Sequence, residues 1–547
     1  MRESFDGIII GAGHNALVLH AYLARAGLRV LTVERAALPG GGLATDENPR
    51  LPGFFHNSHS FFHRGITSMP WYRDHELERH GAVYIEPELN LALVRDDGRT
   101  LEWWLDVDRT LDSVASFSRR DARTLRGWIE RFRPIVEKIV LPEAASPPLP
   151  AARRRELLAR SALGREFLAV SDLSPLEFVA REFEHDTVRA GLLFFNGLRE
   201  VDLRVRGFGH AIPALLAAGR GAQMCRGGSA GLARALVRAI DAHGGEVRCG
   251  VTPRRIAVRS GRAVGIELAD GDAIDARFVV SGLDPWQTFV DLLGPDDVPH
   301  AVRERARAYR YNTLAPLFAV DLALAEPPRY AACEQRPELE QAFLVIVGLE
   351  RFAQFDEIVR AHDRGSVVGA GGAGGAGAAS GTVAWGACPT RFDPAQAPPG
   401  KHTAFLWEKV PFRLRGDPQS WHDERVRHGQ RLLELWRHYA PNVDATNILD
   451  ASFRSPLETV ARLPNLREGD LLGGSFANGQ VGHDRPFTGA GAYRAPVAGL
   501  YLTGSATHPG GNVTGLSGYN AAAVIAADLG VRRWWDASAV EELWAIL

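Results

Sequence analysis

The sequence predicts an α/β fold organised around a Rossmann-like nucleotide-binding domain. Three observations support this. A strand–turn–helix–strand pattern fills residues 5–34, a run of glycines follows at residues 40–42, and a second strand–glycine–helix pattern fills residues 500–530. The chain has 547 residues, which is more than one domain usually holds, so we expect a second domain as well.

The first of these patterns is a βαβ unit. FDGIIIG, residues 5–11, is a short apolar run that ends in glycine, which is typical of a buried parallel strand. Residues 15–26 have the apolar spacing of a helix, and Gly27 is placed to end it. LRVLTVE, residues 28–34, then predicts a second strand.

The turn between the first strand and the helix matches the dinucleotide fingerprint G-x-G-x-x-[G/A]. Gly11 permits a tight turn, Gly13 lets a pyrophosphate approach the backbone, and Ala16 is small enough for the helix to pack on the sheet. The helix N-terminus adds unpaired N–H groups and a partial positive charge. Glu34 ends the second strand, where a carboxylate accepts hydrogen bonds from ribose hydroxyls. The predicted contacts of this unit with a dinucleotide are Gly11, Gly13, His14, Asn15, Ala16, Glu34 and Arg35.

Two further glycine segments favour FAD over NAD. Gly41 and Gly42, followed by Leu43, come directly after the second strand, where a loop would pass the pyrophosphate and ribityl chain. Near the other end, a strand at residues 500–502 is followed by glycines and a helix, whose N-terminus would face the flavin ring and stabilise its reduced, anionic form. The residues predicted there are Gly504, Gly511, Asn512 and Val513. A glycine-rich stretch at residues 367–381 also fits the fingerprint, but no helix follows it, so we expect a loop and no second site.

Together these segments resemble the phytoene desaturase and carotenoid isomerase branch of FAD-dependent oxidoreductases, and especially the phytoene dehydrogenase-related group of the pyridine nucleotide-disulphide oxidoreductase domain 2 type. A third segment, residues 225–285, carries the same resemblance and implies that Val251 lies near the adenine. The resemblance implies a glutathione reductase-type FAD domain formed by residues 1–90, 225–290 and 470–547. It also implies an α+β substrate domain inserted as residues 91–224 and 291–469.

Flavin dehydrogenation moves a hydride to the flavin while a base takes a proton, so we look for bases near the predicted ring. His59, the adjacent Ser58, and His508 are the catalytic candidates, and a structural role is the alternative for each. The candidates for substrate contact are His56, His483, Arg485 and Tyr493. Lys409 could hold a water at the flavin, as a lysine does in amine oxidases, but we expect a solvated lysine at a strand edge.

The expected function is an FAD-dependent dehydrogenase, desaturase or oxidase that takes a hydride and a proton from a small or medium apolar molecule. One alternative is a carotenoid desaturase or isomerase working at a membrane. Residues 141–168 are Arg-rich and partly amphipathic, but a solvated helix is the expected form. Another alternative is a non-catalytic escort protein of the same fold. The electron acceptor is left open among oxygen, a quinone or another compound.

Composition excludes several other classes of function. The formal net charge is −2, which gives no strong attraction for nucleic acid. The four cysteines stand far apart, so neither a metal cluster nor a dithiol centre is expected. We expect no signal peptide and no transmembrane helix, and therefore a cytoplasmic protein.

Overall fold

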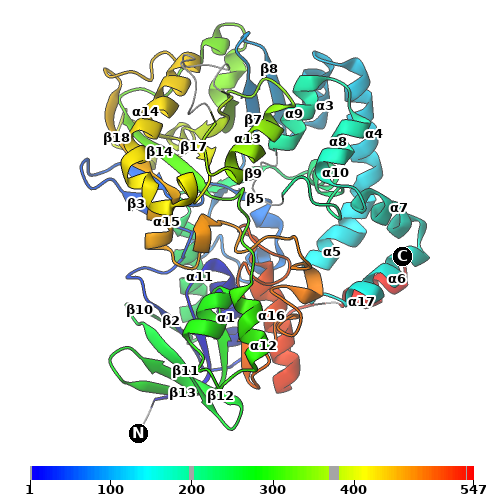
Figure 1. Cartoon of the computed structure of the whole chain (residues 1–547), viewed down its shortest axis with the longest axis vertical. Helices are drawn as coiled ribbons and strands as arrows, with labels where there is room; N and C mark the ends of the chain where they lie inside the picture. The colour runs from blue at the N-terminus through cyan, green and yellow to red at the C-terminus, as the bar shows by residue number, and fades with distance from the viewer. Residues whose placement is uncertain (1–2, 196–201, 369–380, 538) are drawn as a thin grey trace.

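The computed structural model describes residues 3–195, 202–368, 381–537 and 539–547. Two seven-stranded sheets, each made from chain segments that are distant in sequence, organise the molecule (Figure 1). The first sheet lies at the bottom of Figure 1 near the N-terminus, and the second lies at the upper left. Most of the glycine stretch predicted to be a loop, residues 369–380, lies outside the described residues.

The first sheet has the order β10-β2-β1-β13-β12-β11, with β19 also paired to β13. β1, β2, β10, β13 and β19 run parallel to their neighbours in this group, whereas β11 and β12 form an antiparallel extension. The bounds are β1 Ser4–Ile10, β2 Val30–Glu34, β10 Glu246–Cys249, β11 Pro253–Arg259, β12 Arg262–Leu268, β13 Ala273–Ser281 and β19 Leu500–Leu502. All three chain segments assigned to the nucleotide-binding domain therefore contribute strands to this one sheet.

Helices pack on both faces of this sheet, and successive side chains of a strand point to opposite faces. Ile9 of β1 packs toward α1 (His14–Arg25), α11 (Ala230–Asp241) and α16 (Leu516–Leu529). Ile8 and Ile10 point to the opposite face, which α12 (His300–Arg307) covers. The predicted βαβ unit is confirmed, and its helix begins one residue earlier than expected.

α16 approaches α1 so closely that no side chain fits between them. A Cβ atom on Gly518 of α16 would lie 2.0 Å from the carbonyl oxygen of Asn15. This contact brings α16 against the N-terminus of α1. The two predicted glycine corners, which are about 500 residues apart in sequence, are therefore side by side.

The second sheet has the order β18-β14-β17-β16-β15-β7-β8 and is mostly antiparallel, with β15 and β7 parallel. Its bounds are β7 Leu89–Val94, β8 Thr100–Trp104, β14 Leu317–Leu324, β15 Leu344–Val347, β16 Ala384–Ala387, β17 His402–Lys409 and β18 Ile448–Arg454. α14 (Trp421–Tyr439) packs on one face through an apolar cluster that includes Trp421 and Trp436.

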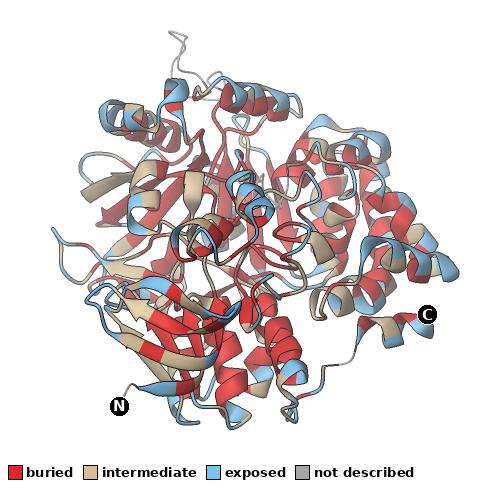
Figure 2. Cartoon of the chain, turned by 60° about the horizontal axis from the view of Figure 1, so that its bottom comes forward, coloured by how far each residue is buried: buried red, intermediate tan, exposed pale blue. Residues whose placement is uncertain are grey.

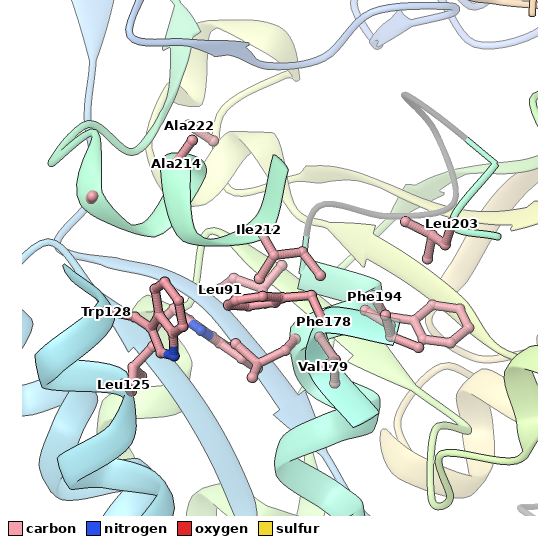
Figure 3. Packing of buried hydrophobic residues seen from close by; sticks show 14 of the residues in the cluster. Leu91, Leu125, Trp128, Phe178, Val179, Phe194, Leu203, Ile212, Ala214 and Ala222 are labelled. Carbon is pink, nitrogen blue, oxygen red and sulfur yellow. The ribbon is translucent and has the colours of Figure 1, made fainter. Parts of the chain in front are cut away.

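A helical layer packs against the other face of the second sheet (Figure 1, right). Its bounds are α3 Val107–Ala115, α4 Arg119–Ile135, α5 Leu141–Ala144, α6 Ala151–Arg160, α7 Ala162–Ser171, α8 Pro175–Glu182, α9 Asp186–Phe195 and α10 Ala211–Ala217. Figure 3 shows how Trp128 of α4, Phe178 of α8 and Ile212 of α10 come together with Leu91 of β7. These aromatic and aliphatic side chains form the core of the inserted domain.

The remaining elements connect or cover these layers. They are β3 Thr45–Glu47, β4 Phe55–Asn57, β5 His63–Arg64, β6 Tyr84–Ile85, β9 Ala222–Cys225, α2 Pro70–Asp74, α13 Gln354–Asp363, α15 Pro456–Arg462 and α17 Val540–Ala545. Figure 2 shows buried strands at the centre and exposed outer faces on the surrounding helices. In the part of the chain that the structure describes, no helix is both long and apolar enough to cross a bilayer.

We keep the division into two domains as a proposal and move one of its boundaries. β7 belongs to the second sheet and begins at Leu89, so the expected boundary after residue 90 would cut through a strand. The inserted domain therefore starts before Leu89. β9, at the end of the first insertion, pairs with both β5 and β6, which lie within residues 63–85.

Candidate active site

The N-terminal glycine turn forms an open corner. Gly13 precedes α1, and no side chain caps the helix N-terminus there. A Cβ atom on Gly13 would meet no atom within 4 Å, and the same holds for Gly42. Gly11 has φ +91°, the left-handed conformation that a tight turn requires. The corner therefore leaves space beside Gly13 and Gly42 that a ligand can enter.

Glu34 closes the same corner from the end of β2. One oxygen of its carboxylate accepts a hydrogen bond from the Ala12 N–H at 2.8 Å, and the other accepts from the Ala36 N–H at 2.9 Å. A carboxylate has about four acceptor positions, so positions remain for ribose hydroxyls. The Val251 N–H donates to the Glu34 backbone carbonyl oxygen at 2.9 Å, which places Val251, in the connection between β10 and β11, beside the end of β2.

The second glycine segment lies directly against the first. The Gly40 N–H donates to the Ala12 carbonyl oxygen at 2.8 Å, and a Cβ atom on Gly41 would lie 3.5 Å from the Gly13 Cα. Leu43 is buried in the core beneath this loop. The Arg35 guanidinium donates to the Arg462 carbonyl oxygen at 2.7 Å, and Arg35 is not among the residues that line the cavity described below.

The C-terminal corner completes the site from the opposite side. Gly504 has φ +98° and packs on Gly282, and the His14 side chain contacts the Asn512 carbonyl oxygen at 3.2 Å. This last contact links the two corners directly. Gly511 was expected to contact the cofactor, but it and Gly510 lie against protein atoms. A Cβ atom on Gly510 would lie 2.4 Å from the Phe476 ring, and one on Gly511 would lie 2.4 Å from the Leu472 carbonyl oxygen. They accommodate the protein's own chain.

A cavity of about 850 Å³ extends from both corners to the second sheet. Its corner end is lined by Gly13, His14, Asn15, Ala16, Gly41, Gly42, Gly504, Asn512 and Val513. Its other end is lined mainly by apolar side chains, among them Phe61, Leu91, Ile346, Trp385 and Trp407. A single cavity thus joins nine of the fifteen predicted cofactor residues to an apolar wall of the inserted domain.

The corner end fits FAD on three structural grounds. The space beside Gly13 and Gly42 is the kind of cradle that a side chain would fill. The uncapped N-termini of α1 and α16 provide N–H donors for phosphate oxygens and for an electron-rich ring edge. In addition, the Asn15 side-chain oxygen is buried without a hydrogen-bond partner among the described residues. When bound, FAD would supply the two-electron acceptor of the reaction.

His59 and His63 follow the glycine loop and line the same cavity. Burial lowers the pKa of His63 to about 3, and this ring contacts the Tyr84 hydroxyl at 2.6 Å. Burial also keeps the pKa of His59 well below its usual value, and nearby Arg454 lowers it further. The His59 Nε2 atom is buried without a hydrogen-bond partner among the described residues. Both imidazoles are therefore neutral at pH 7.

The other two catalytic candidates are turned away from the cavity. Ser58 is buried, and its hydroxyl donates to the Asp46 carboxylate, which Arg462 also binds. The His508 ring contacts the Glu143 carbonyl oxygen at 3.0 Å. Neither residue is among those that line the cavity, so the structure does not support a flavin-facing role for them.

The residues expected at the substrate are also placed elsewhere. Arg485 is fully buried, and its guanidinium donates only to backbone carbonyl oxygens of surrounding loops, those of Gly473, Gly474, Ser475, Gln480 and Ser505. Tyr493 is buried and donates to the His508 carbonyl oxygen. His483 is half-exposed beside Asp484, and His56 lies on β4. None of these four residues lines the cavity, so the expected substrate contacts are corrected.

The side chain of Lys409 is buried, so the expectation of a solvated lysine is wrong. It is 5% exposed, lines the cavity at the end of β17, and donates to the Ala315 carbonyl oxygen at 2.8 Å. The sequence contains a pattern that could have predicted the burial of Lys409. Phe405, Trp407 and Lys409 alternate along the strand, so the lysine shares a face with two aromatic residues.

The comparisons with known proteins agree with this geometry. The sequence profile of the flavin containing amine oxidoreductases matches residues 20–526. The chain belongs to this family. It is therefore an FAD-dependent oxidoreductase of the α/β fold predicted, and the resemblance to phytoene desaturase-like flavoproteins is confirmed. Among the described residues of this flavin amine oxidoreductase, no group of three or more His, Cys, Asp or Glu side chains is arranged to hold a metal ion.

Two relatives cover nearly the whole chain. A limonene dehydrogenase component from Castellaniella defragrans is 30% identical over 552 residues, which cover 97% of this chain and 96% of that protein. Pyridine nucleotide-disulfide oxidoreductase domain-containing protein 2 of Mus musculus is 26% identical, with 97% of this chain and 94% of that protein covered. An oxidoreductase structure from Methanosarcina mazei has a TM-score of 0.56 at 15% identity and covers 95% of this chain and 99% of that chain. This last similarity shows the fold.

Proposed function

We propose that this flavoenzyme dehydrogenates a neutral, largely apolar organic molecule, from which it removes a hydride and a proton. The observation that carries the proposal is the single cavity that joins the glycine corners to an apolar wall of Leu91, Ile346, Trp385 and Trp407. Such a wall contributes affinity through the apolar area it buries, at roughly 25 cal/mol per Å².

The charges around the cavity favour a neutral substrate over a protonated amine. Four cationic side chains line the cavity, those of Arg64, Arg73, Arg220 and Lys409. Among the described lining residues Glu137 is the one carboxylate, and it lies exposed after α4. A substrate ammonium group would be repelled by this surplus of positive charge. The relative named as a limonene dehydrogenase component supports the same choice, since limonene has no ionisable group.

We assign His59 as the residue that takes the substrate proton. Its ring lines the cavity, and its buried Nε2 has no partner among the described residues. Because its pKa is held below the usual value, the ring is unprotonated at pH 7 and has a free nitrogen lone pair, although the same shift makes it a weaker base than an exposed histidine. Ser58 and Asp46, which are hydrogen-bonded to each other, fix the backbone beside it.

Anaerobic reduction of the bound flavin tests this proposal. The yellow holoenzyme is mixed with limonene, menthone and cyclohexylamine, and the bleaching of the visible flavin band is followed. We expect a neutral compound to bleach the flavin and the amine to leave it unchanged. His59→Gln should slow bleaching roughly 100-fold, whereas His300→Gln, a variant of a histidine that is 85% exposed, should match the unaltered enzyme. Bleaching by the amine alone would refute the proposal.

A further inference from the structure

Lys409 is the cationic group buried in the apolar wall of the cavity. Side chains alternate along β17, so Lys409 shares the cavity face with Trp407, and Glu408 points to the opposite face. There the Glu408 carboxylate contacts the His428 ring of α14 at 2.6 Å, with both side chains buried. This contact fixes the orientation of the strand and directs Lys409 into the cavity.

We infer that Lys409 binds an oxygen atom of the substrate, and that the substrate is therefore a carbonyl compound with an apolar body. This inference rests on the proposed function and specifies its substrate class. An ammonium group carries three N–H donors that point in different directions. Lys409 can therefore bond to the Ala315 carbonyl oxygen, at 2.8 Å, and also meet an acceptor that enters from the cavity.

The wall beside Lys409 explains why the oxygen would be placed there. Trp385 of β16 and Trp407 of β17 are direct cross-strand partners, and Ile346 of β15 is opposite Trp385. All three line the cavity, as does Leu91 on the next strand. An apolar body can lie along this strip of four strands with its oxygen at the Lys409 end. A hydrocarbon of the same shape would fill the strip and leave the ammonium without this acceptor.

The same bond would assist the proposed chemistry. When a C–H bond beside a carbonyl group loses its proton, the electron pair left behind is shared with the carbonyl oxygen, which becomes negative. A fixed ammonium group in an apolar, water-poor wall stabilises charge that develops on this oxygen. Lys409 forms no covalent bond in this account. It orients the substrate and lowers the free energy required to remove the proton.

Binding of a matched pair of ligands tests the inference. Carvone and limonene share one carbon skeleton and differ in a carbonyl group. Each is titrated into the oxidised holoenzyme, and the dissociation constant is read from the shift of the flavin absorption band. A hydrogen bond to a charged group predicts that carvone binds roughly 10-fold to 100-fold more tightly than limonene. Lys409→Met should remove this preference and leave limonene affinity unchanged.

Two further variants separate charge from folding. Lys409→Arg retains the positive charge and should keep part of the preference for carvone. Lys401→Met removes a charge from the exposed residue just before the same strand and should behave as the unaltered enzyme. Melting temperatures of all variants with FAD bound show whether the fold is intact.

The outcomes distinguish this inference from the proposed function. If limonene binds and carvone has no advantage, or if Lys409→Met weakens both ligands equally, the inference is wrong and the proposed function stands. If the oxidised enzyme binds neither compound, both are overturned. A carvone preference that only Lys409→Met abolishes supports the inference.

Discussion

The two glycine corners of this enzyme look alike in sequence and differ in what they leave room for. At the N-terminal corner, Cβ atoms on Gly13 and Gly42 would meet no atom within 4 Å. At the C-terminal corner, Cβ atoms on Gly510 and Gly511 would each lie 2.4 Å from protein atoms. The first pair leaves space for a ligand, and the second pair leaves space for the chain itself. A glycine in a motif can therefore serve binding or folding, and only the surroundings tell which.

The largest expected effect comes from Gly511→Ala. The added methyl group would collide with the Leu472 backbone, so the loop and residues 472–476 must shift apart. Overpacking of this kind costs about 1–3 kcal/mol of stability. We expect a clear fall in the melting temperature of the FAD-free protein, measured by circular dichroism. An unchanged melting temperature would show that this corner has the open space found at the other.

Gly13→Ala should have the opposite profile. Gly13 has φ −70° and ψ 162°, which alanine adopts without strain, and the methyl group would meet no protein atom. The melting temperature of the FAD-free protein should therefore stay nearly constant. FAD affinity, measured by isothermal titration calorimetry, should fall roughly tenfold or more because the methyl group occupies the space where the pyrophosphate approaches. If Gly13→Ala lowered the melting temperature and left FAD affinity unchanged, Gly13 would serve folding and not binding, which would contradict the difference between the two corners.

Glu34→Gln sharpens the assignment of the N-terminal corner to the ribose. The amide keeps one oxygen for a backbone N–H and loses the charge and the second acceptor, so FAD should bind roughly tenfold more weakly. Glu47→Gln is the control, because Glu47 is an exposed carboxylate that also accepts from a backbone N–H, that of Gly53. Equal FAD affinity of the two variants would count against the ribose contact.

Acid should destabilise the fold through two histidines of α1, namely His14, which lines the cavity at the N-terminal corner, and the buried His20. Burial lowers the pKa of His14 to about 4 and that of His20 to about 3, from 6.5. Below about pH 6.5 these histidines therefore bind protons in the unfolded chain but not in the folded chain. The free energy of unfolding consequently falls as the pH decreases toward 4. Each such histidine adds at most about 1.4 kcal/mol per pH unit to this slope.

Chemical denaturation at several pH values measures that slope. His20→Gln should reduce it by about the contribution of one histidine, because glutamine carries no proton to titrate. The exposed His300, replaced by glutamine, should leave the slope unchanged. A slope unaffected by His20→Gln would mean that this ring is protonated in the folded protein.

The sequence predicted the parts of the site that depend on local spacing. The glycine turn, Glu34 at the end of β2 and the helix after Gly515 each follow from a pattern that spans no more than about 35 residues, and all are found. Residues whose surroundings come from distant segments were misjudged. His508 was expected near the flavin, but its ring contacts the Glu143 carbonyl oxygen, 365 residues earlier in the chain. Lys409 ends its strand, yet residue 315 and the cavity wall bury it.

The central claim is that both corners hold one FAD molecule. Hydrogen exchange measured by mass spectrometry, with and without FAD, tests it most directly on peptides spanning residues 8–19 and 503–519. We predict that FAD slows amide exchange in both peptides, with one FAD per chain at saturation. Protection of one peptide alone would contradict the claim, because the corners would then not share a ligand.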